Sequence, residues 1–426
     1  MAETADYESL VVENNGHGAF RVARRAYHDE GVYRDEMERI FRRTWLYLGH
    51  ESELAQPGSF LTRRIANRAL LFIRGMDGQI RAFFNLCAHR GAELCAERRG
   101  QARSFTCMYH GWVFGADGKL LGRPGEARYP KEINADGSLN LPAVPRLEEY
   151  RGFFFVNFDR AAEPLESYLG NAREFIDLVL DQSKAGMRIV PGAHEYVIHA
   201  NWKMMAENSV DIYHGQSLHP TYIEYLTSTT GAVNPLARGG GVSRDLGDGH
   251  SVVEYFGPWG RPVAQWIPMW GEAAKSRVEA AHQELKTRMS AERADRIALK
   301  SRNMLVFPNF VLNDIGAVTV RTFQPVSANS MIVHSWALAP KDEPEDMLAV
   351  RLDNYLEFLG PAGFATPDDI EALESCQRGY RGAPEAEWSD ISKGLGFDEQ
   401  DWEDEIQMRG FWKRWRAQMR LNGAAR

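Results

Sequence analysis

The chain has 426 residues, of which 44% are hydrophobic and 25% are charged, and its formal net charge is −8. This composition is typical of a folded globular protein and excludes a largely disordered chain. The acidic balance gives no indication of nucleic-acid binding, and no apolar run is long enough to cross a membrane. Length alone predicts two or three domains.

The N-terminus and the cysteines bear on the compartment. The first residues, MAETADYESLVVENNGHG, are polar and acidic and lack the basic and apolar regions of a secretory signal. Four cysteines in a chain of this length do not make a disulfide framework, so metal binding or plain burial is the better expectation. We therefore expect a cytoplasmic protein. Cys95 and Cys376 have no partner at metal-ligand spacing and are interpreted as buried thiols.

The predicted elements divide the chain into three parts. Residues 1–44 are expected to form a loosely structured arm, up to residue 31, and then a helix from Val32 to about Arg43. Residues 45–160 are expected to form a β-rich domain of short strands and turns. Its clearest elements are a hairpin of Ala69–Ile73 with Gln79–Phe84 and a buried strand at Phe153–Phe158.

Residues 161–426 form the third part and mix helices with antiparallel strands. Asn201 is a candidate N-cap for a helix from Trp202 to about His214, and residues 231–250 are interpreted as a mobile loop. Alternating patterns predict antiparallel strands between Val306 and Leu338. The other predicted helices are 163–185, Ala273–Lys300, Glu345–Leu359, Asp368–Arg378 and a final helix that packs Trp402, Phe411, Trp412 and Trp415 inward.

Two short motifs each offer one thiolate and one imidazole. Cys87-Ala-His89 is followed, after seventeen intervening residues, by Cys107-Met-Tyr-His110. Two thiolates on one iron and two neutral imidazoles on the other give a [2Fe–2S] cluster with a raised reduction potential. The outer N–H groups of the imidazoles can also couple electron transfer to protons. A structural zinc ion is the alternative for the same four residues.

A second group of candidate ligands lies in Glu207-Asn-Ser-Val-Asp211-Ile-Tyr-His214-Gly-Gln-Ser-Leu-His219. The i, i+4, i+7 spacing of Glu207, Asp211 and His214 would place all three on one helix face, with Gly215 ending the helix. Two histidines and one carboxylate can form a facial triad that leaves positions open on iron. On the pattern alone, surface histidines or hydrogen-bonded core histidines are the more common interpretation.

The carboxylate candidate lies far downstream, in Gly363-Phe-Ala-Thr-Pro-Asp-Asp369-Ile-Glu371. Asp369 could complete the triad, with Asp368 as the fallback. The same residues also fit a helix start, with Thr366 as the N-cap and Asp369 at the capping-box position.

The residues of these motifs and their order along the chain resemble those of a known family. Cys87-Ala-His-Arg-Gly91 and Cys107-Met-Tyr-His-Gly-Trp112, with the two later runs in the same order, resemble the large (α) subunits of Rieske non-haem iron oxygenases. The resemblance implies a [2Fe–2S] cluster on Cys87, His89, Cys107 and His110. It also implies one Fe(II) per subunit on His214, His219 and Asp369, and a catalytic role for Asp211 as the acid that bridges the two metal centres.

The resemblance further implies an α+β fold, with a β-sandwich Rieske domain and a helix-grip catalytic domain. It implies an α3 or α3β3 assembly in which His110 of one subunit reaches Asp211 of the next. Electrons from NADH or NADPH would arrive through a reductase, with or without a ferredoxin. No G-x-G-x-x-G reductase fingerprint is present in this chain, which favours separate partner proteins.

The function implied is hydroxylation of an aromatic ring with O2, giving a cis-dihydrodiol. The sequence of Leu359–Asp369 is similar to that of the oxygenase branch that acts on benzoate, anthranilate, salicylate and p-cumate. A substituted benzoate is therefore the first substrate hypothesis. Its carboxylate needs a cationic partner, and the candidates are Arg238, Arg244, Arg302 and Arg321. The alternatives are a Rieske monooxygenase that removes O- or N-methyl groups and a non-catalytic zinc-binding protein.

Overall fold

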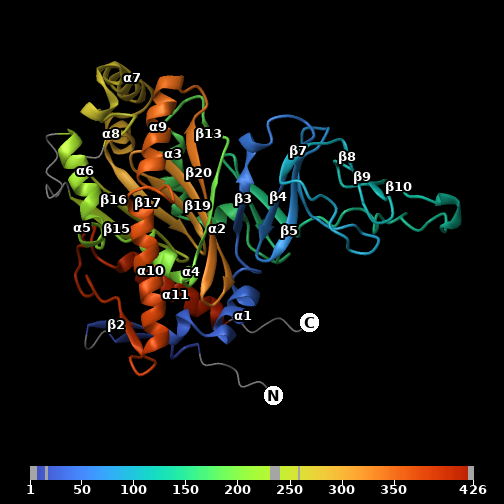
Figure 1. Cartoon of the computed structure of the whole chain (residues 1–426), viewed down its shortest axis with the longest axis horizontal. Coiled ribbons are helices and arrows are strands. Elements are labelled where there is room, and N and C mark those ends of the chain that lie inside the picture. The colour runs from blue at the N-terminus through green and yellow to red at the C-terminus, as the bar shows by residue number, and fades with distance from the viewer. Residues whose placement is uncertain (1–6, 15–17, 231–239, 258–259, 421–426) are drawn as a thin grey trace. The chain divides into compact units, whose positions relative to one another are not determined.

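The computed structural model describes residues 7–14, 18–230, 240–257 and 260–420, which form two compact units (Figure 1). One unit is continuous and spans Phe41–Leu165, whereas the other combines Met1–Ile40 with Glu166–Arg426. The mixture of antiparallel sheets and helices makes the chain an α+β protein, as the sequence predicts.

The Phe41–Leu165 unit consists mainly of short antiparallel strands. They form three small sheets, with strand orders β6-β5-β4-β7, β11-β12-β3 and β10-β9-β8. The hairpin expected from the sequence is confirmed as β5 and β6, and the expected buried strand is β12. The strands are β3 Leu46–His50, β4 Ser59–Ile65, β5 Arg68–Arg74, β6 Ile80–Phe84, β7 Arg99–Gln101, β8 Ser104–Thr106, β9 Val113–Gly115, β10 Leu120–Gly122, β11 Arg146–Tyr150 and β12 Phe153–Asn157.

The second unit is built on an eight-stranded antiparallel sheet with the order β13-β20-β19-β18-β17-β16-β15, in which β14 also pairs with β20. Every residue of β16, β17 and β18 is buried, so both faces of the sheet centre are covered. Helices α9 and α10 run across one face (Figure 1). The strands are β13 Met187–Ile189, β14 His194–Ile198, β15 Gly241–Gly247, β16 His250–Tyr255, β17 Ser301–Val306, β18 Phe310–Asp314, β19 Val318–Ser327 and β20 Ser330–Pro340.

Two of the predicted long helices are each divided into two shorter ones. The single helix expected over Ala273–Lys300 is wrong, because the Ser290 side chain accepts a hydrogen bond from the Arg293 N–H and begins a second helix. The helical stretch expected over 163–185 is likewise two short helices. The helices are α1 Glu30–Arg39, α2 Leu165–Leu169, α3 Ala172–Leu180, α4 Trp202–Asn208, α5 Gly215–Leu218, α6 Pro220–Thr230, α7 Glu272–Arg288, α8 Ala291–Leu299, α9 Glu345–Glu357, α10 Ala365–Gly382 and α11 Ile406–Arg420.

The described part of the N-terminal arm is not loosely structured, so that prediction is wrong. Strands β1 Val11–Asn14 and β2 Ala19–Ala23 pair with each other, and β2 also pairs with β21 Trp388–Asp390 near the other end of the chain. The alternation in β2, with Phe20 and Val22 buried and Arg21 exposed, is a strand pattern that the sequence analysis missed. The arm is therefore held by a strand from a distant part of the sequence.

The expected mobile loop over 231–250 is also wrong where the structure describes it. Residues 241–255 form the hairpin of β15 and β16, and residues 231–239 lie outside the described residues. The turn between the strands uses Asp248 and Gly249, both with positive φ, as short hairpin turns require.

Helix α11 packs Phe411, Trp412 and Trp415 inward, as predicted, whereas Trp402 precedes the helix and is only partly buried. The Trp415 indole N–H donates to the Glu36 carboxylate on α1, at 2.7 Å. Trp202 and Lys203 on α4 donate to the same carboxylate, at 2.8 and 2.6 Å. This fully buried carboxylate therefore ties α1, α4 and α11 together.

Candidate metal centres and pocket

The four predicted cluster ligands lie in two loops of the Phe41–Leu165 unit that share one hydrogen-bond pattern. In the first loop the Gly91 N–H donates to the Cys87 carbonyl, at 2.8 Å, and in the second the Gly111 N–H donates to the Cys107 carbonyl, at 2.9 Å. Gly91 and Gly111 have φ values of 72° and 69°, which side chains disfavour. Each loop is thus a tight turn that its own glycine makes possible.

The loops bring the four side chains together as two pairs. Cys87 and Cys107 are buried, and their thiols are close enough to hydrogen-bond. The rings of His89 and His110 have centroids 4.6 Å apart, and Trp112 stacks on His89 at 4.7 Å. Burial raises the pKa of the Cys87 thiol, while burial and the neighbouring His110 lower the pKa of His89. The His89 Nδ1 atom is buried without a hydrogen-bond partner, so it is free to act as a ligand.

This arrangement fits a two-iron cluster better than a single zinc ion. Zinc requires its donor atoms to lie within about 4 Å of one another, since Zn–S and Zn–N bonds are about 2.3 and 2.1 Å long. Among the described residues, only one group of three or more candidate ligands has donor atoms all within 4.8 Å, and it includes none of these four side chains. A thiolate pair beside an imidazole pair matches a cluster with two cysteines on one iron and two histidines on the other.

The helix that precedes the histidines ends earlier than the spacing predicts. The Asn201 side chain caps α4, as expected, by accepting from the Lys203 N–H. Helix α4 then ends at Asn208, and the Asp211 side chain accepts a 2.8 Å hydrogen bond from the Tyr213 N–H in the following turn. The prediction of one helix face for Glu207, Asp211 and His214 is therefore wrong. Gly215 begins α5 instead of ending a helix.

Asp369 lies inside α10 and not at its cap, so the capping-box interpretation is wrong. Helix α10 begins at Ala365, and its N-cap Phe364 makes no side-chain cap. The Asp369 side chain is buried and accepts a 3.0 Å hydrogen bond from the Asn208 side chain. Asn208 at the end of α4 thereby fixes a carboxylate that arrives from a distant helix.

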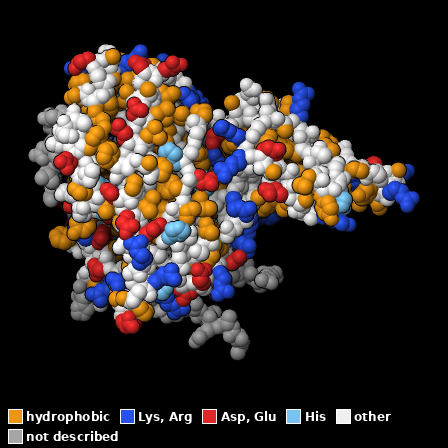
Figure 2. All heavy atoms as spheres, in the orientation of Figure 1, with side chains coloured by type: hydrophobic (Ala, Val, Ile, Leu, Met, Phe, Trp, Pro, Cys, Tyr) orange, Lys and Arg blue, Asp and Glu red, His pale blue; other side chains and the backbone are white. Residues whose placement is uncertain are grey.

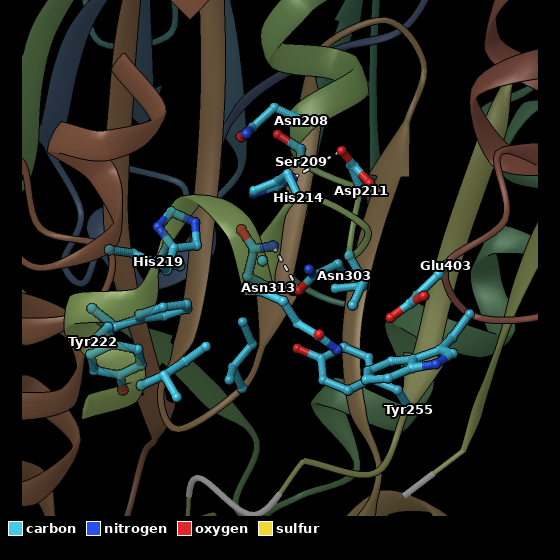
Figure 3. A pocket seen from close by; sticks show the side chains of 18 of the residues that line it. Asn208, Ser209, Asp211, His214, His219, Tyr222, Tyr255, Asn303, Asn313 and Glu403 are labelled. Carbon is cyan, nitrogen blue, oxygen red and sulfur yellow. Dashed lines mark hydrogen bonds and ion pairs between the residues drawn. The ribbon is translucent and has the colours of Figure 1, made fainter. Parts of the chain in front are cut away.

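The three predicted iron ligands form the group whose donor atoms lie within 4.8 Å of one another. The Nε2 atoms of His214 and His219 are each 3.4 Å from the same oxygen, Oδ1 of Asp369. The other ring nitrogens face separate acids: Nδ1 of His214 is 2.9 Å from Asp211, and Nδ1 of His219 is 3.4 Å from Asp368. Figure 3 shows the Asp211–His214 contact. Both imidazoles are therefore oriented with Nε2 toward Asp369, as in carboxylate–histidine–metal sites.

The pKa shifts of His214 and Asp369 are those expected of groups that surround a cation. Burial lowers the pKa of His214, but the hydrogen bonds to Asp211 and Asp369 outweigh it and raise that pKa to about 10. Burial raises the pKa of Asp369, and the two histidines overcome this effect and lower it below its usual range. The site thus favours a positive charge between the two histidine nitrogens and the carboxylate. A metal ion would compete with protons for these same donor atoms.

A pocket adjoins the two histidines. Its wall combines aromatic and aliphatic side chains with polar and charged ones, and Figure 3 shows His219 and Tyr222 on one side and Tyr255 and Glu403 on the other. The lining includes Asn208, Asp211, His214, His219, Tyr222, Tyr255, Asn303, Asn313, Ile315, Arg321, Phe358, Leu359, Trp402 and Glu403. An aromatic ring could lie directly beside the candidate iron ligands.

The four candidate arginines differ in their burial and in their contacts. Arg302 is buried but engaged by Glu254 and Asp314, at 2.9 and 3.0 Å. Arg244 is exposed, Arg238 lies outside the described residues, and Arg321 lines the pocket. Sequence reasoning did not separate these four and also missed the orienting roles of Asn208 and Asp368.

Neither of the two remaining cysteines belongs to a group of candidate metal ligands among the described residues. Cys95 is buried, as expected, and its thiol donates to Glu97 at 3.3 Å. Cys376 is exposed on α10, so its predicted burial is wrong. Its residue type gave no signal of the helix face on which it lies.

Comparison with known families identifies the two units. Residues 44–145 match the Rieske [2Fe-2S] domain, and residues 189–421 match the catalytic domain of the ring hydroxylating alpha subunit. The chain belongs to the α subunits of Rieske aromatic-ring-hydroxylating oxygenases. It is therefore a dioxygenase-type enzyme whose cofactors are a [2Fe–2S] cluster and a mononuclear iron, and the expected pairing of a Rieske domain with a catalytic domain is confirmed.

Individual relatives support the same family. The chain is 34% identical over 407 residues to the toluate 1,2-dioxygenase subunit alpha of Pseudomonas putida, covering 91% of this chain and 85% of the relative. It is 33% identical over 389 residues to the 2-halobenzoate 1,2-dioxygenase large subunit of Burkholderia cepacia, covering 88% and 80%. A solved naphthalene 1,2-dioxygenase with indole in its active site superimposes with a TM-score of 0.82 at 28% identity, covering 96% and 94%. None of the helices among the described residues is both long and apolar enough to span a bilayer.

Proposed function

We propose that this α subunit hydroxylates a substituted benzoate at two adjacent ring carbons and gives a cis-dihydrodiol. The observation that carries the proposal is the His214–His219–Asp369 group, whose two histidines line a pocket with aromatic and aliphatic side chains in its wall. The printed names of two relatives, which act on toluate and 2-halobenzoate, support an aromatic acid as the substrate.

The ligand assignments follow from the donor atoms. Cys87, His89, Cys107 and His110 hold the cluster, and His214, His219 and Asp369 hold the iron. When bound, these groups supply single-electron transfer and oxygen activation. Asp368 is assigned to orienting His219, because its carboxylate faces Nδ1 and leaves Nε2 to the metal.

Electron entry requires a second copy of the chain in this proposal. The Asp211 side chain is 21% exposed and contacts His214, so one carboxylate oxygen can hold His214 while the group stays accessible. The cluster loop carries the exposed hydrophobic residues Met108 and Tyr109 beside His110, and Figure 2 shows hydrophobic side chains in this part of the unit. Asp211 would receive a hydrogen bond from His110 of a neighbouring subunit in an α3 or α3β3 assembly.

The proposed partners are a reductase that takes electrons from NADH or NADPH, with or without a ferredoxin. Reconstitution of the purified chain with such a reductase and a panel of aromatic acids tests the function. We expect cis-dihydrodiols from substituted benzoates, identified by mass spectrometry and NMR. Formaldehyde release from methoxy- or methylamino-benzoates without a dihydrodiol would instead support the demethylating monooxygenase. Colourless protein with zinc and no iron would contradict both.

The bridging role of Asp211 has a separate test. Asp211→Ala should leave the visible absorption of the cluster and the iron content unchanged when iron is supplied in excess, yet abolish turnover. In a rapid-mixing experiment, the reduced cluster of the variant should also be reoxidised more slowly than that of the parent. Normal reoxidation in the variant would show that electrons do not pass by Asp211.

A further inference from the structure

Arg321 is a buried cation in the pocket without a partner of opposite charge. It lies on β19 with 4% of its surface exposed, and among the described lining residues it is the one arginine or lysine. Its Nε atom is buried and has no hydrogen-bond partner. None of the ion pairs among the described residues includes it. The burial of such a charge costs several kcal/mol unless something compensates it.

Other deeply buried arginines of this chain are compensated within the fold. Arg351 donates from two nitrogens to Glu343, at 2.7 and 2.8 Å. Arg261 donates to both carboxylate oxygens of Asp314, at 2.9 Å each. Arg321 has the same planar fork of donors and no carboxylate to receive it. The missing partner is therefore expected to come from a ligand, and a carboxylate is the group whose geometry fits this fork.

Arg321 lines the same pocket as His214 and His219 and shares a neighbour, Tyr196, with Asp369. Arg321 and Asp369 both act on the hydroxyl of Tyr196: burial raises its pKa, Asp369 raises it further and Arg321 lowers it. A hydrogen bond from the Arg321 side chain also contributes to the lowering. Since charges act on a hydroxyl in this way over short distances, Arg321 and Asp369 lie near the same hydroxyl group.

The rest of the wall determines how an aromatic acid could lie. Tyr222 and Phe358 stack on each other, with centroids 4.7 Å apart, and Leu359 lies beside them in the lining. Glu403 lies with Tyr255 on the side opposite His219 (Figure 3). A carboxylate is repelled by Glu403 and attracted by Arg321, whereas the ring is accommodated by the apolar wall.

We propose that the Arg321 guanidinium binds the carboxylate of the aromatic acid substrate and thereby selects acids over neutral rings and orients the ring beside His214 and His219. This inference rests on the proposed function, because it requires an aromatic acid as the substrate. It also explains the unpaired buried charge: the free protein is less stable than it could be, and the substrate supplies the compensating group.

The test compares benzoate with benzamide, a neutral molecule of nearly the same shape. Isothermal titration calorimetry on the oxidised, metal-loaded protein under argon measures both affinities without turnover. Arg321→Gln should weaken benzoate binding about 100-fold and change benzamide binding less than about twofold, since two charge-assisted hydrogen bonds are lost. Arg321→Lys should lose about tenfold for benzoate, because the charge remains without the fork.

Arg244→Gln is the matched control, since Arg244 is an exposed arginine on β15 of the same sheet. It should bind benzoate as the parent does. Arg321→Gln should also keep its iron and melt no lower than the parent, because no ion pair is lost. Loss of iron or a lower melting temperature would make Arg321 a structural residue and overturn the inference. Equal benzoate affinity in the parent and in Arg321→Gln would overturn this inference but not the proposed function. A parent protein that binds no aromatic acid would overturn the proposed function as well.

Discussion

The proposed cluster loops and the proposed iron site are encoded in the chain in different ways. Each cluster loop holds one thiolate and one imidazole within four residues and closes itself with a glycine N–H on a cysteine carbonyl. The iron site instead takes two histidines from around α5 and a carboxylate from α10. The first kind of site is largely preformed by local turns, whereas the second exists only after distant helices have packed.

The difference extends to the groups that orient the ligands. In the iron site each donor side chain has its own partner: Asp211 for His214, Asp368 for His219 and Asn208 for Asp369. In the cluster loops the orientation comes mainly from backbone turns and from Trp112 stacked on His89. Substitutions should therefore act locally in the cluster loops and through remote partners in the iron site.

The largest expected effect separates the two sites altogether. Cys107→Ser should abolish the cluster absorption and all turnover, while iron per chain falls from about three to about one. The mononuclear iron should remain, since the two ligand sets share no residue. Iron analysis by mass spectrometry and visible spectroscopy measure this, with exposed Cys376→Ser as the unaffected control. Loss of all iron would show that the sites depend on each other.

A pair of neighbouring substitutions tests which acid binds the iron. Asp369→Asn should remove the mononuclear iron and keep the cluster. Asp368→Asn should only weaken iron binding, about 10- to 100-fold, because Asp368 contacts Nδ1 of His219 and not Nε2. Titration of iron-depleted protein with Fe(II) measures both. The reverse order of effects would assign the iron to Asp368.

A pH-dependent effect should arise beneath the iron site, at Glu207. Burial raises its pKa to about 7, although Tyr27 and Trp412 donate hydrogen bonds to it and Lys203 is nearby. The unfolded chain releases this proton near pH 4.5, so the folded state is penalised as the pH rises from 4.5 to 7, by up to about 3 kcal/mol.

Glu207→Gln should remove that penalty, because the amide oxygen can still accept from Tyr27 and Trp412. The variant should melt several degrees above the parent at pH 8 and at nearly the same temperature at pH 5. Differential scanning calorimetry of the metal-loaded proteins checks this. An equal difference at both pH values would mean that the Glu207 carboxyl does not titrate in this range.

The smallest expected effect compares two glycines. Gly91→Ala should cost about 1–2 kcal/mol from its positive φ alone, because an added Cβ meets no atom within 4 Å. Gly215→Ala should be neutral or stabilising by up to about 1 kcal/mol, since Gly215 is the first residue of α5 and also has open space. Thermal midpoints measure both. A destabilising Gly215→Ala would show that the iron site also needs a flexible turn.

The same contrast explains what the sequence could predict. The cluster loops were predictable because spacing, residue type and glycine positions all lie within six-residue segments. The β5–β6 hairpin and the strands β18 to β20 followed from alternation and turn residues. Strand β2 was missed although its alternation is visible in the sequence, whereas its pairing with the distant β21 could not be predicted from a local pattern.

The iron site was only partly predictable. The spacing around Thr366 and Asp369 favours a helix cap over a metal ligand, and only the approach of His214 and His219 to Asp369 supports the ligand. The end of α4 at Asn208 was hidden because Ser209 and Asp211 make local side-chain hydrogen bonds that compete with the helix. Resemblance to the family supplied the assignment that helical periodicity could not.

The pairing of β2 with β21 has a consequence for the order of events during synthesis. Residues 41–165 leave the ribosome as an uninterrupted unit, so this unit can fold and receive its cluster while the rest of the chain is still being made. The other unit needs β21, and α11 with its Trp415 contact to Glu36, before its core is complete. Because Trp402 and Glu403 line the pocket, the pocket cannot be completed before the end of the chain is made, and a chain truncated near its end should have a folded cluster-binding unit and an incomplete active site.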